Sequence, residues 1–172
     1  MYYKWDNYLS DLENLTAAAD VVVAGFGAHP ASWGQWSYGR FHAEARRVAD
    51  VLCRRSRAKP VLFYGAPAWP KAKLVENFRA TNARLAAFNG LSVAALQAAC
   101  EAQRAAQRRD AAAAAGERRA AVPLVNSFGL SSGNLKLSKD DAHYDGSFVV
   151  AELAHQVLRQ MCAEPGTAHD AL

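Results

Sequence analysis

Cysteine is scarce in this sequence, and its distribution argues against both a zinc site and a disulfide-rich fold. The three cysteines, Cys53, Cys100 and Cys162, lie far apart and form no CxxC pair. Their odd number and wide spacing do not fit a zinc knuckle or a full disulfide framework. We therefore predict that the cysteines are buried free thiols and that the protein has no metal site.

The sequence also lacks long hydrophobic runs. No apolar stretch approaches the roughly 20 residues that a membrane-spanning helix requires. The N-terminal stretch MYYKWDNYLSDL has no basic start followed by an apolar segment, so it does not have the pattern of a secretory leader. We expect no membrane span, and the sequence by itself leaves the compartment unknown.

Positive charge is in slight excess, with 20 Lys and Arg against 16 Asp and Glu and a formal net charge of +4. Much of the excess lies in an alanine-rich stretch, residues 97–120, which has no interleaved aromatic side chains. We predict a solvated helical insertion there and no nucleic-acid partner. A nucleic-acid binder whose affinity falls steeply with added salt is the weaker alternative. The arginines concerned are Arg104, Arg108, Arg109, Arg118 and Arg119.

The pattern of apolar residues predicts alternating helices and strands. With 172 residues, 51% of them hydrophobic, the chain can form one domain over residues 1–172. Helical spacing occurs over residues 5–15, 40–57, 73–88, after Gly90, and 146–161, whereas 21–27, 61–65 and 122–126 are short strand-like runs. This order is typical of an α/β fold with three layers, in which helices cover both faces of a parallel sheet.

Polar and aromatic residues gather in the segments that follow the three predicted strands, namely residues 27–40, 65–71 and 129–146. In open parallel sheets, ligands bind beyond the carboxyl ends of the strands. We therefore expect a functional site in these three loops.

The stretch LSKDDAHYDGSF, residues 137–148, places Asp140 three residues before His143. A general base needs its imidazole held in one tautomer, and a carboxylate that accepts the Nδ1 proton does this. Three residues apart in a tight turn, the two side chains can reach each other. The alternative is that Asp140, Asp141 and Asp145 form a turn and helix cap with His143 solvated, because a lone Asp-x-x-His pattern is weak.

The position of this pair, between the last strand and the last helix, resembles the fifth sequence block of SGNH (GDSL-type) hydrolases. In that family an Asp-x-x-His near the C-terminus supplies the acid and base of a Ser-His-Asp triad. The resemblance implies that His143 is the catalytic base and that Asp140 is the acid that orients it. It also implies chemistry that needs no cofactor.

A second resemblance lies in the stretch DVVVAGFGAHP, residues 20–30, which is similar to the third block of the same family. There, a Gly-x-Asn turn contributes to the oxyanion hole. The resemblance assigns Gly27 to the glycine and His29 to the asparagine, and a neutral imidazole can donate one hydrogen bond. Alternatively, His29 packs beneath the neighbouring tryptophans. In the PC-esterase and polysaccharide O-acetyltransferase branch, which KPVLFYGAPAWP also resembles, Gly25 replaces the asparagine.

The family's nucleophile has no counterpart here, because the sequence contains no Gly-Asp-Ser turn. None of the serines near the expected rim is predicted to form an exposed elbow between a strand and a helix. We therefore expect a domain that is incomplete at its N-terminus and lacks its first strand, or else a pseudoenzyme. A missing strand would leave a sheet edge open to self-association. The serines in question are Ser32, Ser37, Ser127, Ser131 and Ser132.

Four aromatic residues in the rim loops, Trp33, Trp36, Tyr38 and Trp69, are candidate substrate-binding residues. Indole rings that stack on sugar faces would suit the glycan esters that the PC-esterase resemblance implies. The alternative is a lid that packs on its own sheet edge, since tryptophans are usually largely buried.

The sequence thus predicts an ester hydrolase or O-acyl(acetyl)transferase that acts on acyl esters, with a carbohydrate as the candidate substrate. The main alternative is a non-catalytic binding module with the same fold. The resemblance implies a location in the secretory pathway or outside the cell.

Overall fold

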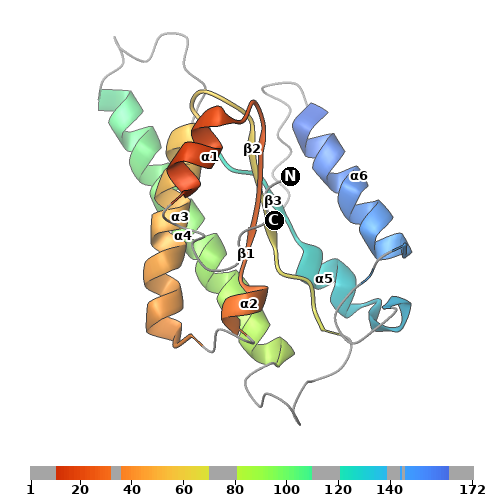
Figure 1. The fold of residues 1–172 in the computed structure, drawn as a ribbon. Helices are drawn as coiled ribbons and strands as arrows, with labels where there is room; N and C mark the ends of the chain where they lie inside the picture. The colour runs from red at the N-terminus through yellow and green to blue at the C-terminus, as the bar shows by residue number, and fades with distance from the viewer. Residues whose placement is uncertain are drawn as a thin grey trace.

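The computed structural model describes residues 11–31, 36–69, 81–109, 121–138, 144 and 146–162, with the backbone alone of His29. Figure 1 shows the helices and strands in their order along the chain. They are α1 (Leu12–Ala18), β1 (Val22–Phe26), α2 (Ala28–Ala31), α3 (Tyr38–Arg55), β2 (Val61–Gly65), α4 (Asn82–Arg109), β3 (Leu124–Val125), α5 (Ser127–Ser132), the 3-10 helix η1 (Leu135–Leu137) and α6 (Phe148–Cys162).

The three described strands form one parallel sheet in the order β1-β2-β3. Val22 pairs with Val61 and Phe26 with Gly65, while Phe63 pairs with Leu124. The predicted α/β class with a parallel sheet is therefore confirmed, although helices outweigh the short strands.

One face of the sheet packs against α3 and α4. Side chains alternate between the faces of a strand, so Val22, Val61 and Phe63 share this face and belong to the main core. The ring of Phe41 in α3 stacks on Phe88 in α4 at a centroid distance of 3.9 Å. These aromatic and β-branched side chains all belong to the core cluster of the described structure.

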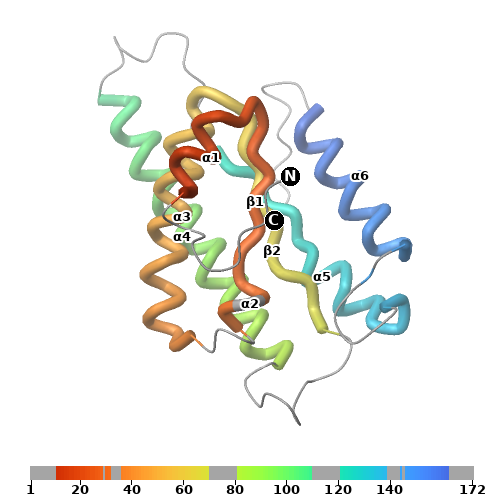
Figure 2. Tube along the Cα trace, viewed as in Figure 1, coloured from red at the N-terminus to blue at the C-terminus, as the bar shows by residue number. Residues whose placement is uncertain are grey.

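The opposite face is covered only in part. Figures 1 and 2 show α5 and α6 on this side of the sheet and α3 with α4 on the other. α6 contacts β2 and β3, and its Val149 is fully buried. Near β1 this face is more exposed: Val23 of β1 is 45% exposed, and Tyr64 of β2, which pairs with Gly25, is 39% exposed.

Helix α4 is one continuous helix, whereas the sequence predicted two helical stretches around Gly90. A glycine inside a helix costs roughly 0.5–1 kcal/mol relative to alanine. Burial of Leu85, Phe88 and Leu96 against α3 and the sheet outweighs this cost. Residues 97–109 of the predicted insertion continue α4, with Ala99 and Cys100 buried, and residues 110–120 lie outside the described structure.

By length and composition, α4 is the described helix that could cross a membrane. Its apolar face is occupied in the structure by α3 and by the core side chains of the sheet. Of its most apolar window of 18 residues, 39% is buried inside the structure.

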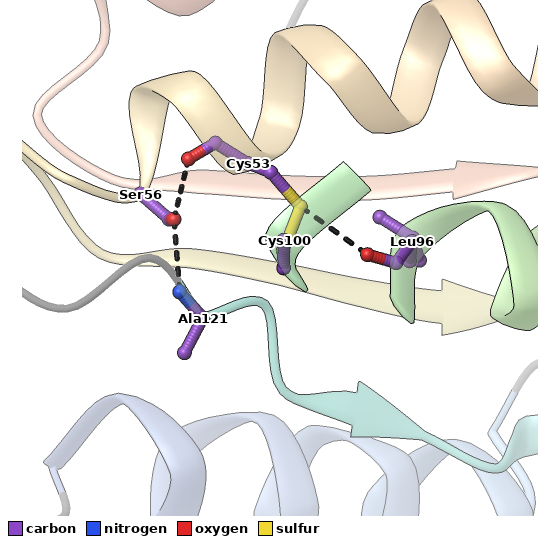
Figure 3. Close-up of a disulfide and its surroundings, with 5 residues drawn as sticks. All are labelled: Cys53, Ser56, Leu96, Cys100 and Ala121. Atoms are coloured by element: carbon purple, nitrogen blue, oxygen red, sulfur yellow. Dashed lines mark hydrogen bonds between the residues drawn. A yellow bond between two sulfur atoms is a disulfide. The ribbon is translucent and has the colours of Figure 1, made fainter. Parts of the chain in front are cut away.

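The prediction of three buried free thiols was wrong. Figure 3 shows that Cys53 of α3 and Cys100 of α4 form a disulfide, with their Cα atoms 5.1 Å apart. Cys162 is free and exposed. The two cysteines are 47 residues apart in sequence. They meet because both lie on the faces along which α3 and α4 pack, and only the tertiary fold determines that contact.

Candidate functional site

The carboxyl ends of β1 and β2 lie side by side at one edge of the sheet, because the strands are parallel and in register. Gly27 directly follows β1, and Ala66 directly follows β2. A methyl group placed on Gly27 would lie 3.7 Å from Cβ of Ala66 and 3.8 Å from Oδ1 of Asn89. The segments that follow β1 and β2 are therefore in close contact at this edge.

Two asparagines of α4 hold residues 66–69, the post-β2 loop. The side-chain amide of Asn89 accepts a hydrogen bond from the backbone N–H of Ala66 and donates one to its carbonyl, both at 2.9 Å. Asn82 makes the same pair of hydrogen bonds with Trp69, both at 2.8 Å. Each amide thus satisfies both polar groups of one loop residue, as a neighbouring strand would.

The other side of the post-β2 loop is held by hydroxyl groups. Ser131 of α5 accepts the N–H of Ala68 at 2.7 Å, and the hydroxyl of Tyr144 donates to the carbonyl of Ala68 at 2.9 Å. Ser127 donates its hydroxyl to the carbonyl of Gly65 at the end of β2. Burial raises the pKa of Tyr144 above its ordinary value of 10.0.

The predicted catalytic pair, Asp140 and His143, lies outside the described residues. Tyr144, the residue that follows His143, is 5% exposed and is bonded to the post-β2 loop. Tyr144 itself is thus held beside the loop that follows β2, at the edge of the sheet where β1 and β2 end.

The two candidate oxyanion glycines have different surroundings. Gly27 has φ of +138°, which disfavours any residue with a Cβ. Gly25 lies within β1, where a Cβ would come within 2.6 Å of three ring atoms of Tyr64. Gly25 therefore allows Tyr64 to lie across the strand. The backbone of His29 is in α2, and its side chain lies outside the described structure.

The candidate aromatic residues are only partly solvent-facing. Trp69 is 6% exposed and belongs to the core, whereas Tyr38 at the start of α3 is 50% exposed. Trp36 meets Phe26 edge-on at 6.0 Å and has the guanidinium of Arg40 4.2 Å from its ring centroid. Trp33 lies outside the described residues.

The segment after β1 is also tied to α4, through Arg84. The guanidinium of Arg84 donates to the carbonyl of Ala31 at 3.0 Å and to the carbonyl of Trp36. It lies 4.7 Å from the ring centroid of Phe88 and 5.3 Å from that of Tyr38. Arg84 therefore connects both described ends of this segment to the core.

Ser127 occupies the junction between β3 and α5, where the sequence predicted no exposed elbow serine. It is fully buried and donates its hydroxyl to Gly65, so it is not available to attack a substrate. Ser37 is the N-cap of α3 and accepts from the N–H of Arg40. Ser132 is exposed, with its hydroxyl donated to Gly129, and Ser32 lies outside the described residues.

Within the described parts of the chain, no group of three or more His, Cys, Asp or Glu side chains could hold a metal ion.

Sequence reasoning missed the residues that hold the post-β2 loop: Asn82, Asn89, Ser131 and Tyr144. A signal was present for the asparagines, because both share the helical face of Leu85, which is buried. A polar amide on a buried face needs hydrogen-bond partners. No comparable signal marked Tyr144, whose partner is 76 residues away.

Comparisons with protein-family models, with curated proteins and with solved structures give no match for this chain.

Proposed function

We propose that the chain is part of an SGNH-type esterase or O-acyltransferase of the PC-esterase kind, with a three-layer α/β/α fold. It would act on acyl esters, acetyl esters of glycans above all. In this proposal His143 is the general base, Asp140 orients it, and Gly27 with His29 lines the oxyanion side. In the alternative alignment, Gly25 stands in the place of the family's asparagine.

The observation that carries the proposal is the bond from Tyr144 to the post-β2 loop. It holds the residue after His143 at the sheet edge where Gly27 follows β1. A base and an oxyanion donor must both reach one acyl carbonyl, so they must share an edge. The helices seen on both sides of the sheet in Figure 1 also suit the three-layer fold.

The chemistry would follow the serine hydrolase scheme. A serine attacks the acyl carbonyl, His143 takes its proton, and Asp140 stabilises the imidazolium that forms. The imidazolium gives this proton to the departing alcohol, whose ester bond breaks to leave an acyl-enzyme. Water or a sugar hydroxyl then loses its proton to His143 and attacks the acyl-enzyme, and the serine leaves with that proton. Trp33, Trp36, Tyr38 and Trp69 are the proposed substrate-side aromatics, among which Tyr38 has the largest described exposure.

We place the nucleophilic serine outside these 172 residues. The sequence has no Gly-Asp-Ser turn, and the serine at the described strand-to-helix junction, Ser127, is buried. A fluorophosphonate probe tests this directly. We expect no labelling of the present chain, but labelling of a single serine in a form extended upstream to include a Gly-Asp-Ser turn, with loss of labelling in His143→Ala of that form.

Stoichiometric labelling of a serine within the 172 residues would contradict this assignment. If the upstream reading frame holds no Gly-Asp-Ser turn, the second candidate function applies, a non-catalytic glycan-binding or protein-binding module. Ser127 is buried, and the hydroxyl of Ser37 accepts a hydrogen bond from the N–H of Arg40. Both observations agree with a non-catalytic module as well as with the esterase. It predicts binding of acylated glycans without their hydrolysis.

The Cys53–Cys100 disulfide supports a further part of the proposal, which is folding in an oxidising compartment. Disulfides persist in secreted and luminal proteins and are rare in the reducing cytosol. The disulfide thus agrees with the secretory or extracellular location that the resemblance implies.

A further inference from the structure

The side-chain amide of Asn89 lies where β1 and β2 end. It accepts the N–H of Ala66 and donates to the carbonyl of the same residue, both at 2.9 Å. A Cβ built on Gly65 would lie 3.2 Å from its Oδ1, and one built on Gly27 would lie 3.8 Å from the same atom. The nitrogen of the amide must face the Ala66 carbonyl, because only that end of the amide has protons to donate.

Asn89 is also the one asparagine in the sequence that is followed by a glycine, Gly90. Asparagine is a chemically labile residue, because the backbone nitrogen of the next residue can attack its side-chain carbonyl carbon. Glycine favours this attack, since it has no Cβ to shield its nitrogen and its backbone reaches more conformations than that of any other residue. The Asn89–Gly90 pair is therefore the most reactive asparagine position of the chain.

The folded helix keeps the reacting atoms apart. Both residues lie inside α4, where the N–H of Gly90 is directed at the carbonyl four residues earlier. The Cβ of a helical residue tilts toward the N-terminus of the helix, so the side chain of Asn89 starts away from the nitrogen of Gly90. The two hydrogen bonds with Ala66 hold the amide in that position.

We propose that Asn89–Gly90 is a deamidation site that α4 protects in the folded protein and that unfolding exposes. The nitrogen of Gly90 bonds to Cγ of Asn89, the Cγ–Nδ2 bond breaks, and ammonia leaves with the proton of the Gly90 N–H. Water then opens the cyclic imide at one of its two carbonyl carbons. The product is an aspartate at residue 89 or an isoaspartate, in which the main chain runs through Cγ.

Either product releases the post-β2 loop from α4. A carboxylate has no proton to donate, so one of its oxygens would face the Ala66 carbonyl, which now accepts the Nδ2 proton at 2.9 Å. An isoaspartate adds an atom to the main chain within α4 and breaks the repeat of its hydrogen bonds. Unfolding would thus leave a permanent change at the edge where β1 and β2 end.

The test compares the native chain with the chain unfolded in urea without reductant, both kept at mildly alkaline pH. Peptide mass spectrometry measures aspartate and isoaspartate at residue 89. We expect conversion to be at least roughly tenfold slower in the folded protein, because it must wait for α4 to open. Asn82 is the internal control: it makes the same pair of hydrogen bonds with Trp69, but Ala83 follows it, so it should stay unconverted in both samples.

Gly90→Ala is the matched variant. It retains the Asn89 amide, and an added Cβ meets no atom within 4 Å in the folded helix. We expect little conversion of this variant even in urea. After removal of urea, the converted wild type should show a lower urea midpoint than the identically treated Gly90→Ala, measured against the untreated form of each, and fresh Asn89→Asp should show the same loss.

Three results would overturn the proposal. Equal conversion of Asn89 in the folded and unfolded chain would show that α4 does not protect it. Conversion in urea that is no faster at Asn89 than at Asn82 would show that the Asn-Gly pair is not the reactive site. An unchanged urea midpoint in both the converted protein and Asn89→Asp would show that the amide does not hold the post-β2 loop.

Discussion

Gly27 and Gly90 differ in whether their positions can accept a side chain. Gly27 has a positive φ of +138°, whereas Gly90 lies inside α4 with no atom within 4 Å of an added Cβ. We predict that Gly27→Ala lowers the free energy of unfolding by roughly 1–3 kcal/mol through backbone strain. Gly90→Ala should raise it by about 0.5–1 kcal/mol. Urea unfolding of the two variants checks both signs, and an equal effect would contradict the assigned conformations.

The phenol of Tyr144 makes the free energy of unfolding depend on pH in the alkaline range. Because burial raises its pKa above 10.0, the unfolded chain loses this proton at a lower pH than the folded protein does. Above that pH the folded state holds more protons, so the free energy of unfolding falls as pH rises. We predict that wild type loses more stability than Tyr144→Phe between pH 9 and pH 11, as chemical unfolding at each pH would show. Parallel pH curves would contradict the buried phenol.

At the scale of elements, most helices and strands could be predicted because their apolar spacing is regular. The face of Phe41, Ala45, Val48 and Leu52 in α3 is buried as expected, and β1 and β2 are the apolar runs that the sequence indicated. The continuity of α4 through Gly90 could not be predicted, because burial on α3 decides it. The sequence indicated the edge of the sheet at which a site is expected. The side chains that hold the loops there could not be predicted, because they depend on contacts distant in sequence.

The disulfide joins α3 to α4, which together form the largest helix packing in the described structure. Closing a loop of this length should stabilise the fold by about 4 kcal/mol in the chain-entropy account. We predict one reactive thiol, Cys162, in the unreduced protein after denaturation, and three after reduction. Reduction should shift the urea midpoint downward. Three thiols without reductant would contradict the disulfide.

For the whole molecule, the open face and free edge of β1 are the main structural liability. Val21 and Val23 are 38% and 45% exposed, and β1 has a strand neighbour on one side only among the described residues. Edge strands of this kind pair with other chains unless charge blocks them. We predict self-association, which Val23→Lys should abolish and Val23→Thr should not, as measured by light scattering after size exclusion. A wild-type mass of 18.6 kDa at high concentration would contradict the prediction.

The proposed function requires that the imidazole of His143 face the Gly27 edge of the sheet, and paramagnetic broadening tests this requirement most directly. A nitroxide is attached at Ala28→Cys in a Cys162→Ser background, and a second sample carries it at the native Cys162 on the far end of α6. The account predicts that the label at residue 28 broadens the His143 ring signal strongly and that the label at Cys162 leaves it sharp. A His143 signal that stays sharp with the label at residue 28, or broadens with the label at Cys162, would contradict the account.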